Sequence, residues 1–229
     1  HGYPTVRTHA LARSADLDAL SVPDPHSDGR MPELLRAAVI LHHEVGDEVL
    51  VVGCVVGPMT LATQLLGVES ALFLAIDDPD AFARLLDFAA AVAIRFGVAQ
   101  LASGVHLPLV FDPSVSPALI PAPFFREFEL PRLCRVFAAF REAGAPANWL
   151  HITGPAAAIF PYYPEAGVDI ANFDYLVDPQ TATAALPGIC LNGNIKPLAF
   201  VDSRPDEIAA EATRLRRYFA DRGGYILAP

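Results

Sequence analysis

The sequence predicts an α/β protein, a (β/α)8 TIM barrel of which six strands can be recognised. Short apolar runs alternate with longer segments whose apolar residues recur at helical spacing. Neither of the glycine-rich phosphate loops of open nucleotide-binding sheets, G-x-G-x-x-G and G-x-x-x-x-G-K-[ST], occurs. Polar residues recur instead where strand after strand ends, which is the arrangement that a barrel active site requires.

The six apolar runs are predicted to be strands buried on both faces. β-Branched and apolar residues dominate them, and their lengths suit strands better than helices. Pro108 is an unusual residue inside the second run. Because helical segments separate the runs, we expect parallel pairing with right-handed crossovers. The predicted strands are 50–56, 105–112, 148–152, 168–173, 188–193 and 224–228.

Four segments with an apolar stripe are predicted to be helices. The clearest has Asp78 as its N-cap and Pro79 in its first turn. Pro131 should kink the third helix, and Gly144 should end it. Ser203 is the expected cap of the fourth. The predicted helices are 31–45, 79–103, 123–143 and 205–221.

Composition limits the partners of the protein. Hydrophobic residues make up 53% and charged residues 18%, which allows a sizeable core and argues against disorder. The formal net charge is −10 and no Lys/Arg cluster stands out, so neither nucleic acid nor an anionic membrane is an expected partner. No uninterrupted apolar run reaches the roughly 20 residues of a membrane span. The length fits one domain over 1–229.

The cysteines and the chain ends suggest a reduced, incomplete protein. Cys54, Cys134 and Cys190 fit neither a disulfide framework nor a Cys-x-x-Cys metal site, so we expect a cytoplasmic protein. No initiator methionine is present, and the sequence stops in a predicted strand. We therefore expect the N- and C-terminal parts of the barrel, with two further strands, to lie outside this sequence. No G-x-S-x-G elbow occurs, which argues against a serine hydrolase.

Polar side chains end four of the predicted strands. Asp112, His151 and Asp174 end or follow three of them, and Asn192 and Asn194 end a fourth. A barrel brings such ends together at one mouth, where partial burial suits carboxylates and imidazoles to proton transfer. Asp112, His151 and Asp174 are therefore the candidate catalytic residues. Structural roles stay open, because the aspartates can cap turns, His151 can be a satisfied core histidine and the asparagines can form turns.

Five segments, in order, resemble one superfamily. They are G-P-M-T-L-A with Q-L-L-G (57–67), D-P with I-P, F-R-E-F and L-P (112–131), L-H-I-T-G (150–154), G-V-D with a later Asp (167–174) and G-N-I-K-P (193–197). The sequence is similar, from about Pro23 onward, to the uroporphyrinogen decarboxylase and methylcobamide:coenzyme M (corrinoid-dependent) methyltransferase superfamily. That resemblance implies a (β/α)8 barrel.

The resemblance leaves two enzymatic branches and one non-catalytic alternative. The first two segments look closer to the methyltransferases, which move a methyl group between a corrinoid protein and coenzyme M or tetrahydrofolate. The corrinoid would then be carried by a partner protein. Decarboxylases of porphyrin biosynthesis need no cofactor, and a basic cleft would favour that branch, but the strand ends offer only Lys196, with Arg204 farther along. A barrel that only binds a small molecule is the third alternative.

Zinc separates the branches further. The resemblance implies that thiol-activating members bind zinc through a histidine, a cysteine two residues later and a cysteine after the last strand, and bound zinc lowers the pKa of the thiol. His151 matches the first position, but Thr153 occupies the second, and the third would fall beyond Pro229. One family ligand is thus present, which argues against zinc.

A zinc-free relative that handles methyltetrahydrofolate fits these residues better. The resemblance then implies that Asp112, Asp174 and Asn194 hydrogen-bond a pterin, with His151 as a polar partner. The candidate substrate-binding residues are Met59, Thr60, Thr153, Asn172, Asn192 and Asn194.

Overall fold

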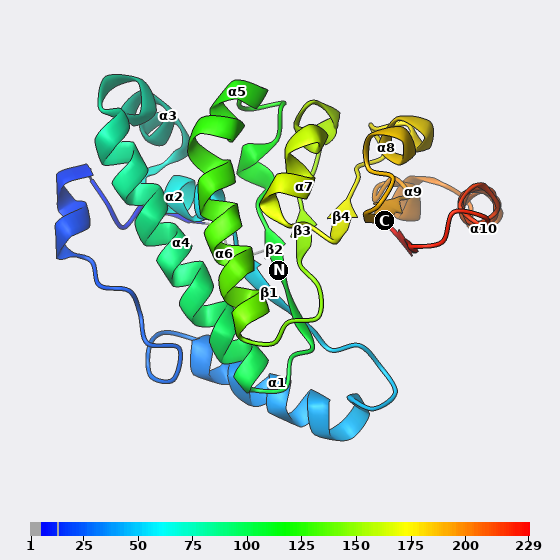
Figure 1. Ribbon diagram of the computed structural model, residues 1–229, viewed down its shortest axis with the longest axis horizontal. Coiled ribbons are helices and arrows are strands. Elements are labelled where there is room, and N and C mark those ends of the chain that lie inside the picture. Colours follow the sequence, from blue (N-terminus) through cyan, green and yellow to red (C-terminus); the bar gives the residue numbers. More distant parts are fainter. Residues whose placement is uncertain (1–5, 13) are drawn as a thin grey trace.

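The computed structural model describes residues 6–12 and 14–229, and its centre is one parallel six-stranded sheet (Figure 1). The strands are ordered β1-β2-β3-β4-β5-β6, as they follow one another in the chain. This sequential order is that of a (β/α)8 barrel, whereas the strand order of a doubly wound sheet reverses at a switch point. The predicted fold class is confirmed, with six strands forming an open sheet in the described residues.

All six predicted strands are present, each within or close to its predicted range. Parallel pairing is also confirmed for every neighbouring pair. The strands are β1 (Val52–Val56), β2 (Leu107–Phe111), β3 (Trp149–His151), β4 (Ile170–Asn172), β5 (Cys190–Asn194) and β6 (Tyr225–Ala228).

The two sides of the sheet differ in burial. One row of in-register side chains packs under the helices and is at most 1% exposed: Val55, Val110, Leu150, Ala171 and Leu191. The neighbouring row on the opposite face is half-buried or exposed: Cys54, Leu109, Trp149, Ile170 and Cys190. The alternation of a strand therefore separates a helix-covered face from an inner face. The prediction of burial on both faces is wrong for the inner face, where Cys54 is exposed.

Two long helices, α4 (Pro79–Ala102) and α6 (Leu130–Glu142), lie side by side over the helix-covered face (Figure 1). The predicted cap of α4 is confirmed, since the Asp78 carboxylate accepts a hydrogen bond of 2.9 Å from the Ala81 N–H. Among the described helices α4 alone is long and apolar enough to span a membrane by itself. It packs as a core helix, with Phe82, Leu85 and Leu86 buried.

The third and fourth predicted helices need corrections. The third is three segments, α5 (Ala122–Phe124), a π turn η3 (Phe125–Glu129) and α6, so the irregularity precedes Pro131. That proline lies in the first turn of α6, where its missing N–H is tolerated. The fourth helix, α10 (Pro205–Tyr218), is capped at Arg204, whose N–H donates to the Glu207 carboxylate at 3.0 Å, so Ser203 is not the cap.

Other short elements connect the strands. The predicted first helix is confirmed as α1 (Met31–Val45), whereas the helices that follow β1 were not predicted. These further elements are η1 (Ser14–Ala19), α2 (Pro58–Leu66), α3 (Val68–Asp77), η2 (Pro113–Val115), η4 (Ala156–Tyr162), α7 (Tyr163–Ala166), α8 (Pro179–Ala185) and α9 (Ala199–Asp202).

Candidate functional site

Five of the predicted residues line one small pocket at the carboxyl ends of β3, β4 and β5. The pocket, called the histidine pocket below, has a volume of about 80 Å3. Its walls come from the strand ends and from the loops that follow them, as expected for a parallel sheet. It is lined by His151, Thr153, Asn172, Phe173, Asp174, Tyr175, Asn194, Ile195, Pro197 and Pro229.

His151 is a half-buried imidazole on the inner face of the sheet. It pairs in register with Phe111, and the two ring centres are 5.2 Å apart. Burial lowers the pKa of His151 because the imidazolium loses solvation, and the negative charge of Asp174 partly opposes this. The imidazole is therefore neutral at pH 7 and can accept a proton or a hydrogen bond.

Asp174 is held at the rim of the histidine pocket by the backbone. One carboxylate oxygen accepts a hydrogen bond of 2.9 Å from the Gly154 N–H, and the other accepts one of 2.9 Å from the Leu176 N–H. These bonds tie the loop after β3 to the loop after β4. The carboxylate is thereby fixed as a negative charge that acts on the nearby imidazole.

Three buried asparagines occupy the ends of β4 and β5. Asn194 is 8% exposed, and its Nδ2 donates to the Val177 carbonyl at 3.1 Å, while its Oδ1 has no partner. Asn172 likewise has an unpartnered Oδ1 and donates to the Asn192 carbonyl at 3.4 Å. Asn192 donates to the backbone of β6 and does not line the pocket. Buried amide oxygens of this kind are acceptors for a donor from a ligand or water.

Asp112 is placed differently from the other predicted residues. It follows β2 by one residue, so the alternation of the strand turns its side chain toward the helices, away from the face of His151. The carboxylate is fully buried and caps α2. It accepts hydrogen bonds from the Thr60 N–H (2.8 Å), the Thr60 hydroxyl (2.5 Å) and the Met59 N–H (3.3 Å).

The structure therefore does not bring Asp112, Met59 and Thr60 to the histidine pocket. Met59 is 1% and Thr60 5% exposed, and both lie in the first turn of α2. Only the backbone of Asp112 is near the site, because its N–H donates to the His151 carbonyl at 2.9 Å. A catalytic role for Asp112 stays a prediction, and its contacts give it a structural one.

Glu129 is a buried acid that the sequence reading missed. It is 1% exposed, and neither carboxyl oxygen has a hydrogen-bond donor, although it interacts with Asp112. Burial, then the charge of Asp112, raises the pKa of Glu129 well above its ordinary value. Both effects favour the neutral form of Glu129 beside the Asp112 carboxylate. Its position four residues after Phe125 and four before Leu133, on an apolar stripe, is the sequence signal.

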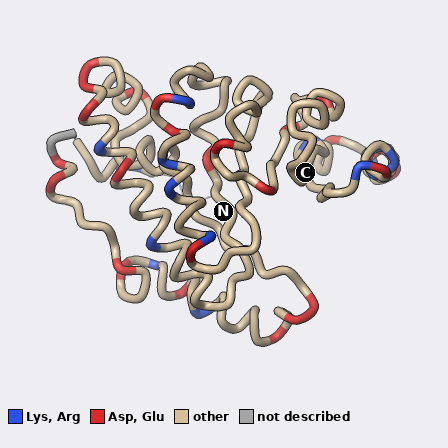
Figure 2. Tube along the Cα trace, viewed as in Figure 1, with Lys and Arg blue, Asp and Glu red and all other residues tan. Residues whose placement is uncertain are grey.

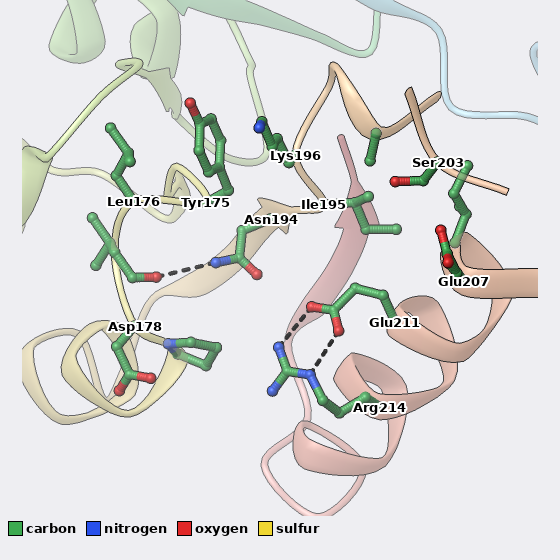
Figure 3. Close-up of a pocket in the computed structure, with 14 residues that line it drawn as sticks. Tyr175, Leu176, Asp178, Asn194, Ile195, Lys196, Ser203, Glu207, Glu211 and Arg214 are labelled. Atoms are coloured by element: carbon green, nitrogen blue, oxygen red, sulfur yellow. Dashed lines mark hydrogen bonds and ion pairs between the residues drawn. The ribbon is translucent and has the colours of Figure 1, made fainter. Parts of the chain in front are cut away.

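A larger pocket adjoins the histidine pocket. Its volume is about 610 Å3, and Tyr175, Asn194 and Ile195 line both (Figure 3). The loops after β4 and β5 and one side of α10 form its walls. Lys196, Glu211 and Arg214 are among the charged residues around it, and of these the sequence reading considered only Lys196.

The residues of the histidine pocket do not fit a zinc ion. Across residues 6–12 and 14–229, no group of three or more His, Cys, Asp or Glu side chains could hold a metal ion. His151 has Thr153 where a cysteine would be required, and a hydroxyl is a poor ligand beside thiolates. Both oxygens of Asp174 already accept backbone hydrogen bonds.

Known proteins resemble this chain in sequence and in fold. The family model "Uroporphyrinogen decarboxylase (URO-D)" matches residues 1–229. Methylcobamide:CoM methyltransferase MtbA of Methanosarcina mazei is 28% identical over 93% of this chain and 62% of that protein. Methylcobamide:CoM methyltransferase MtaA of Methanosarcina barkeri is 30% identical over 93% of this chain and 62% of that protein.

A decarboxylase and a solved structure complete the comparison. Uroporphyrinogen decarboxylase of Syntrophotalea carbinolica is 30% identical over 97% of this chain and 64% of that protein. A methyltransferase structure from Methanosarcina mazei superposes with a TM-score of 0.87 at 27% identity, over 99% of this chain and 65% of that one. The chain thus spans less than two thirds of the length of these relatives. It belongs to the uroporphyrinogen decarboxylase (URO-D) family.

Proposed function

We propose that the chain carries the site of a methyltransferase that moves a methyl group between a corrinoid and a small acceptor. The corrinoid would be carried by a partner protein, and the acceptor would be a thiol such as coenzyme M, or tetrahydrofolate. Relatives named methylcobamide:CoM methyltransferases support this reading over most of the chain. The observation that carries it is the neutral, half-buried His151 beside the fixed carboxylate of Asp174.

A thiol acceptor needs a group that takes its proton. The sulfur then attacks the methyl carbon, a C–S bond forms, and the electron pair of the broken cobalt–carbon bond stays on cobalt. His151 is the group in the histidine pocket that can accept the proton. Free thiols titrate about two pKa units above histidine, so this transfer costs at least about 3 kcal/mol. The negative charge of Asp174 offsets part of that cost by stabilising the imidazolium.

Tetrahydrofolate would use the same pocket differently. The unpartnered amide oxygens of Asn172 and Asn194 can accept hydrogen bonds from ring N–H groups. Both acceptors therefore belong in the first assay.

Uroporphyrinogen decarboxylation is the second candidate, because a relative of that name is 30% identical. Its substrate carries several carboxylates and calls for several free cations. Around the two pockets Lys196 and Arg214 supply the positive charge, and Arg214 is paired with Glu211. Acidic and basic residues are also interspersed along the rest of the described chain (Figure 2). The small number of free cations around the pockets favours methyl transfer over decarboxylation.

The test uses the full-length protein with free methylcobalamin as donor and coenzyme M or tetrahydrofolate as acceptor. We expect acceptor-dependent loss of the methylcobalamin absorbance and formation of the methylated acceptor. The matched variant His151→Gln should slow the reaction about 10²–10⁴-fold, the usual contribution of a general base. Carbon dioxide release from uroporphyrinogen without methyl transfer would replace the proposal with the decarboxylase. Inactivity toward all three substrates would leave the non-catalytic barrel as the function. One zinc per chain by elemental analysis would refute a zinc-free site.

A further inference from the structure

The larger pocket and the histidine pocket share a wall. Tyr175, Asn194 and Ile195 line both, so a molecule that reaches His151 from this side extends into the larger pocket. The larger pocket, at about 610 Å3, lies within the usual range for small-molecule sites, whereas the histidine pocket, at about 80 Å3, accommodates only a few atoms.

Most charges around the larger pocket are already paired or capped. Arg214 donates two hydrogen bonds, of 2.8 and 2.7 Å, to the two carboxylate oxygens of Glu211 (Figure 3). The carboxylate of Asp178 accepts two backbone hydrogen bonds at the start of α8, and that of Glu207 accepts one at the start of α10. Glu207 also pairs with Arg204 at 3.7 Å, so Arg214, Glu211 and Glu207 are neutralised in ion pairs. Asp178 keeps its negative charge at the start of α8.

Lys196 is the exception. Its side chain is exposed, and among the described residues it has no carboxylate within ion-pair distance. Its Nζ lies 5.9 Å from the ring centre of Tyr175, so the charge is positioned beside the shared wall (Figure 3). A cation with no counter-ion at the rim of a pocket attracts an anion.

The wall itself contains an unpartnered acceptor. Asn194 is 8% exposed, and its Nδ2 is used by the Val177 carbonyl. Its Oδ1 has no partner and points away from that bond, into the larger pocket (Figure 3). Leaving a buried acceptor without a donor costs about 1–3 kcal/mol, which an N–H or O–H of a bound molecule or water recovers. This oxygen marks the wall as a polar contact for a ligand, whereas the preference for an anion comes from Lys196 alone.

We propose that the larger pocket binds the charged end of the methyl acceptor, a small organic anion, with Lys196 as its anion-binding residue. The reacting end of the same molecule then lies in the histidine pocket at His151. This inference rests on the function proposed above and adds the charge that the acceptor must carry. Lys196 contacts the part of the acceptor that does not react, so it sets specificity.

Two thiols that differ only in charge test the inference. Coenzyme M carries a sulfonate where 2-mercaptoethanol carries a hydroxyl. With methylcobalamin as donor, we expect the full-length protein to prefer coenzyme M by at least about tenfold in kcat/KM, because hydrogen bonds to charged groups contribute about 1.5–3 kcal/mol. Lys196→Gln should erase most of this preference through KM, and Lys196→Arg should retain most of it.

Arg217→Gln is the matched control. It removes the same charge from an exposed arginine of α10 that does not line the pocket, so the preference should stay unchanged. An equal preference in wild type and Lys196→Gln, or a loss of the same size in Arg217→Gln, would overturn the inference and leave the proposed function intact. Should neither thiol be methylated, the proposal of a thiol as the methyl acceptor fails. Calorimetric titration with coenzyme M then decides the pocket separately, since equal affinity of wild type and Lys196→Gln overturns the inference and a tenfold loss supports it.

Discussion

The buried pair of Glu129 and Asp112 should make the protein less stable as the pH rises. Burial raises the pKa of both groups, and the charge of Asp112 raises that of Glu129 further. In the unfolded chain a glutamate has a pKa of about 4.3. The unfolded state therefore releases a proton that the folded state retains. The stabilisation that the proton on Glu129 provides is complete below about pH 4.3. It is lost as the pH rises toward the folded pKa of Glu129, by up to about 1.4 kcal/mol per pH unit.

Glu129→Gln isolates this effect. Glutamine has nearly the same shape, offers an N–H donor to the Asp112 carboxylate and cannot ionise. We expect the free energy of unfolding of the variant to match wild type near about pH 5 within about 1 kcal/mol, and then to exceed it increasingly toward pH 8. Urea unfolding at about pH 5, 6, 7 and 8 measures the difference.

Glu127→Gln is the control, because this glutamate lies in the same π turn with an exposed side chain. Its effect should stay within about 0.5 kcal/mol at every pH. A difference between Glu129→Gln and wild type that does not change with pH would refute the conclusion that Glu129 is held as a neutral acid. An equal pH slope in both variants would refute it too.

Three further substitutions test the site and the packing around it. Because burial lowers the pKa of His151, kcat/KM for methyl transfer should rise with pH and level off below about pH 6.5. His151→Gln should lack this pH-dependent rise. A rise that levels off well above about pH 6.5 would contradict a neutral imidazole. A Cβ on Gly57 would lie 2.2 Å from an Asp112 carboxylate oxygen, so Gly57→Ala should lower the unfolding free energy by about 1–3 kcal/mol, whereas Gly188→Ala, which meets nothing within 4 Å, should not. Arg132 donates to Asp87 at 2.9 Å and to two backbone carbonyls, and its side chain is 12% exposed. Arg132→Met should therefore lower the free energy of unfolding in urea by about 1–3 kcal/mol. An equal loss in Arg135→Met, whose side chain is 54% exposed, would show that burial does not decide the effect.

The strands were predictable because a buried parallel strand is a short and mainly apolar run. The run from Val52 to Val56 illustrates this, since five apolar or small residues precede a Gly-Pro. The helices after β1 were harder to predict. Gly57-Pro58 is a sound helix start, but α2 ends at Gly67 after nine residues, and α3 begins at once. Two short helices joined at a glycine lack the long stripe that identified α4.

The sequence predicted the edge of the sheet at which the histidine pocket lies. It did not predict to which face of the sheet each side chain points. Parallel strands bring their carboxyl ends to one side of the sheet, and this placed His151, Asp174 and Asn194 together. Which way a side chain points depends on its register, and a shift of one residue reverses it. Because β2 ends at Phe111, the side chain on the inner face is that phenylalanine, and Asp112 points outward. An apolar run shows roughly where a strand ends but not its last residue.

Two groups of Asp112, its carboxylate and its N–H, explain how this residue can matter to the site without touching a substrate. Its carboxylate holds the first turn of α2, and its N–H holds the carbonyl of His151 at 2.9 Å. Moving the carboxylate therefore shifts the strand end that carries the imidazole, and a displacement of a fraction of an ångström lowers the rate of a positioned proton transfer. A loss of activity on substitution of Asp112 thus follows from a structural role as directly as from a catalytic one. The free energy of unfolding of the variant distinguishes the two roles. It falls together with the activity if the role of Asp112 is structural, and it stays constant if the role is catalytic.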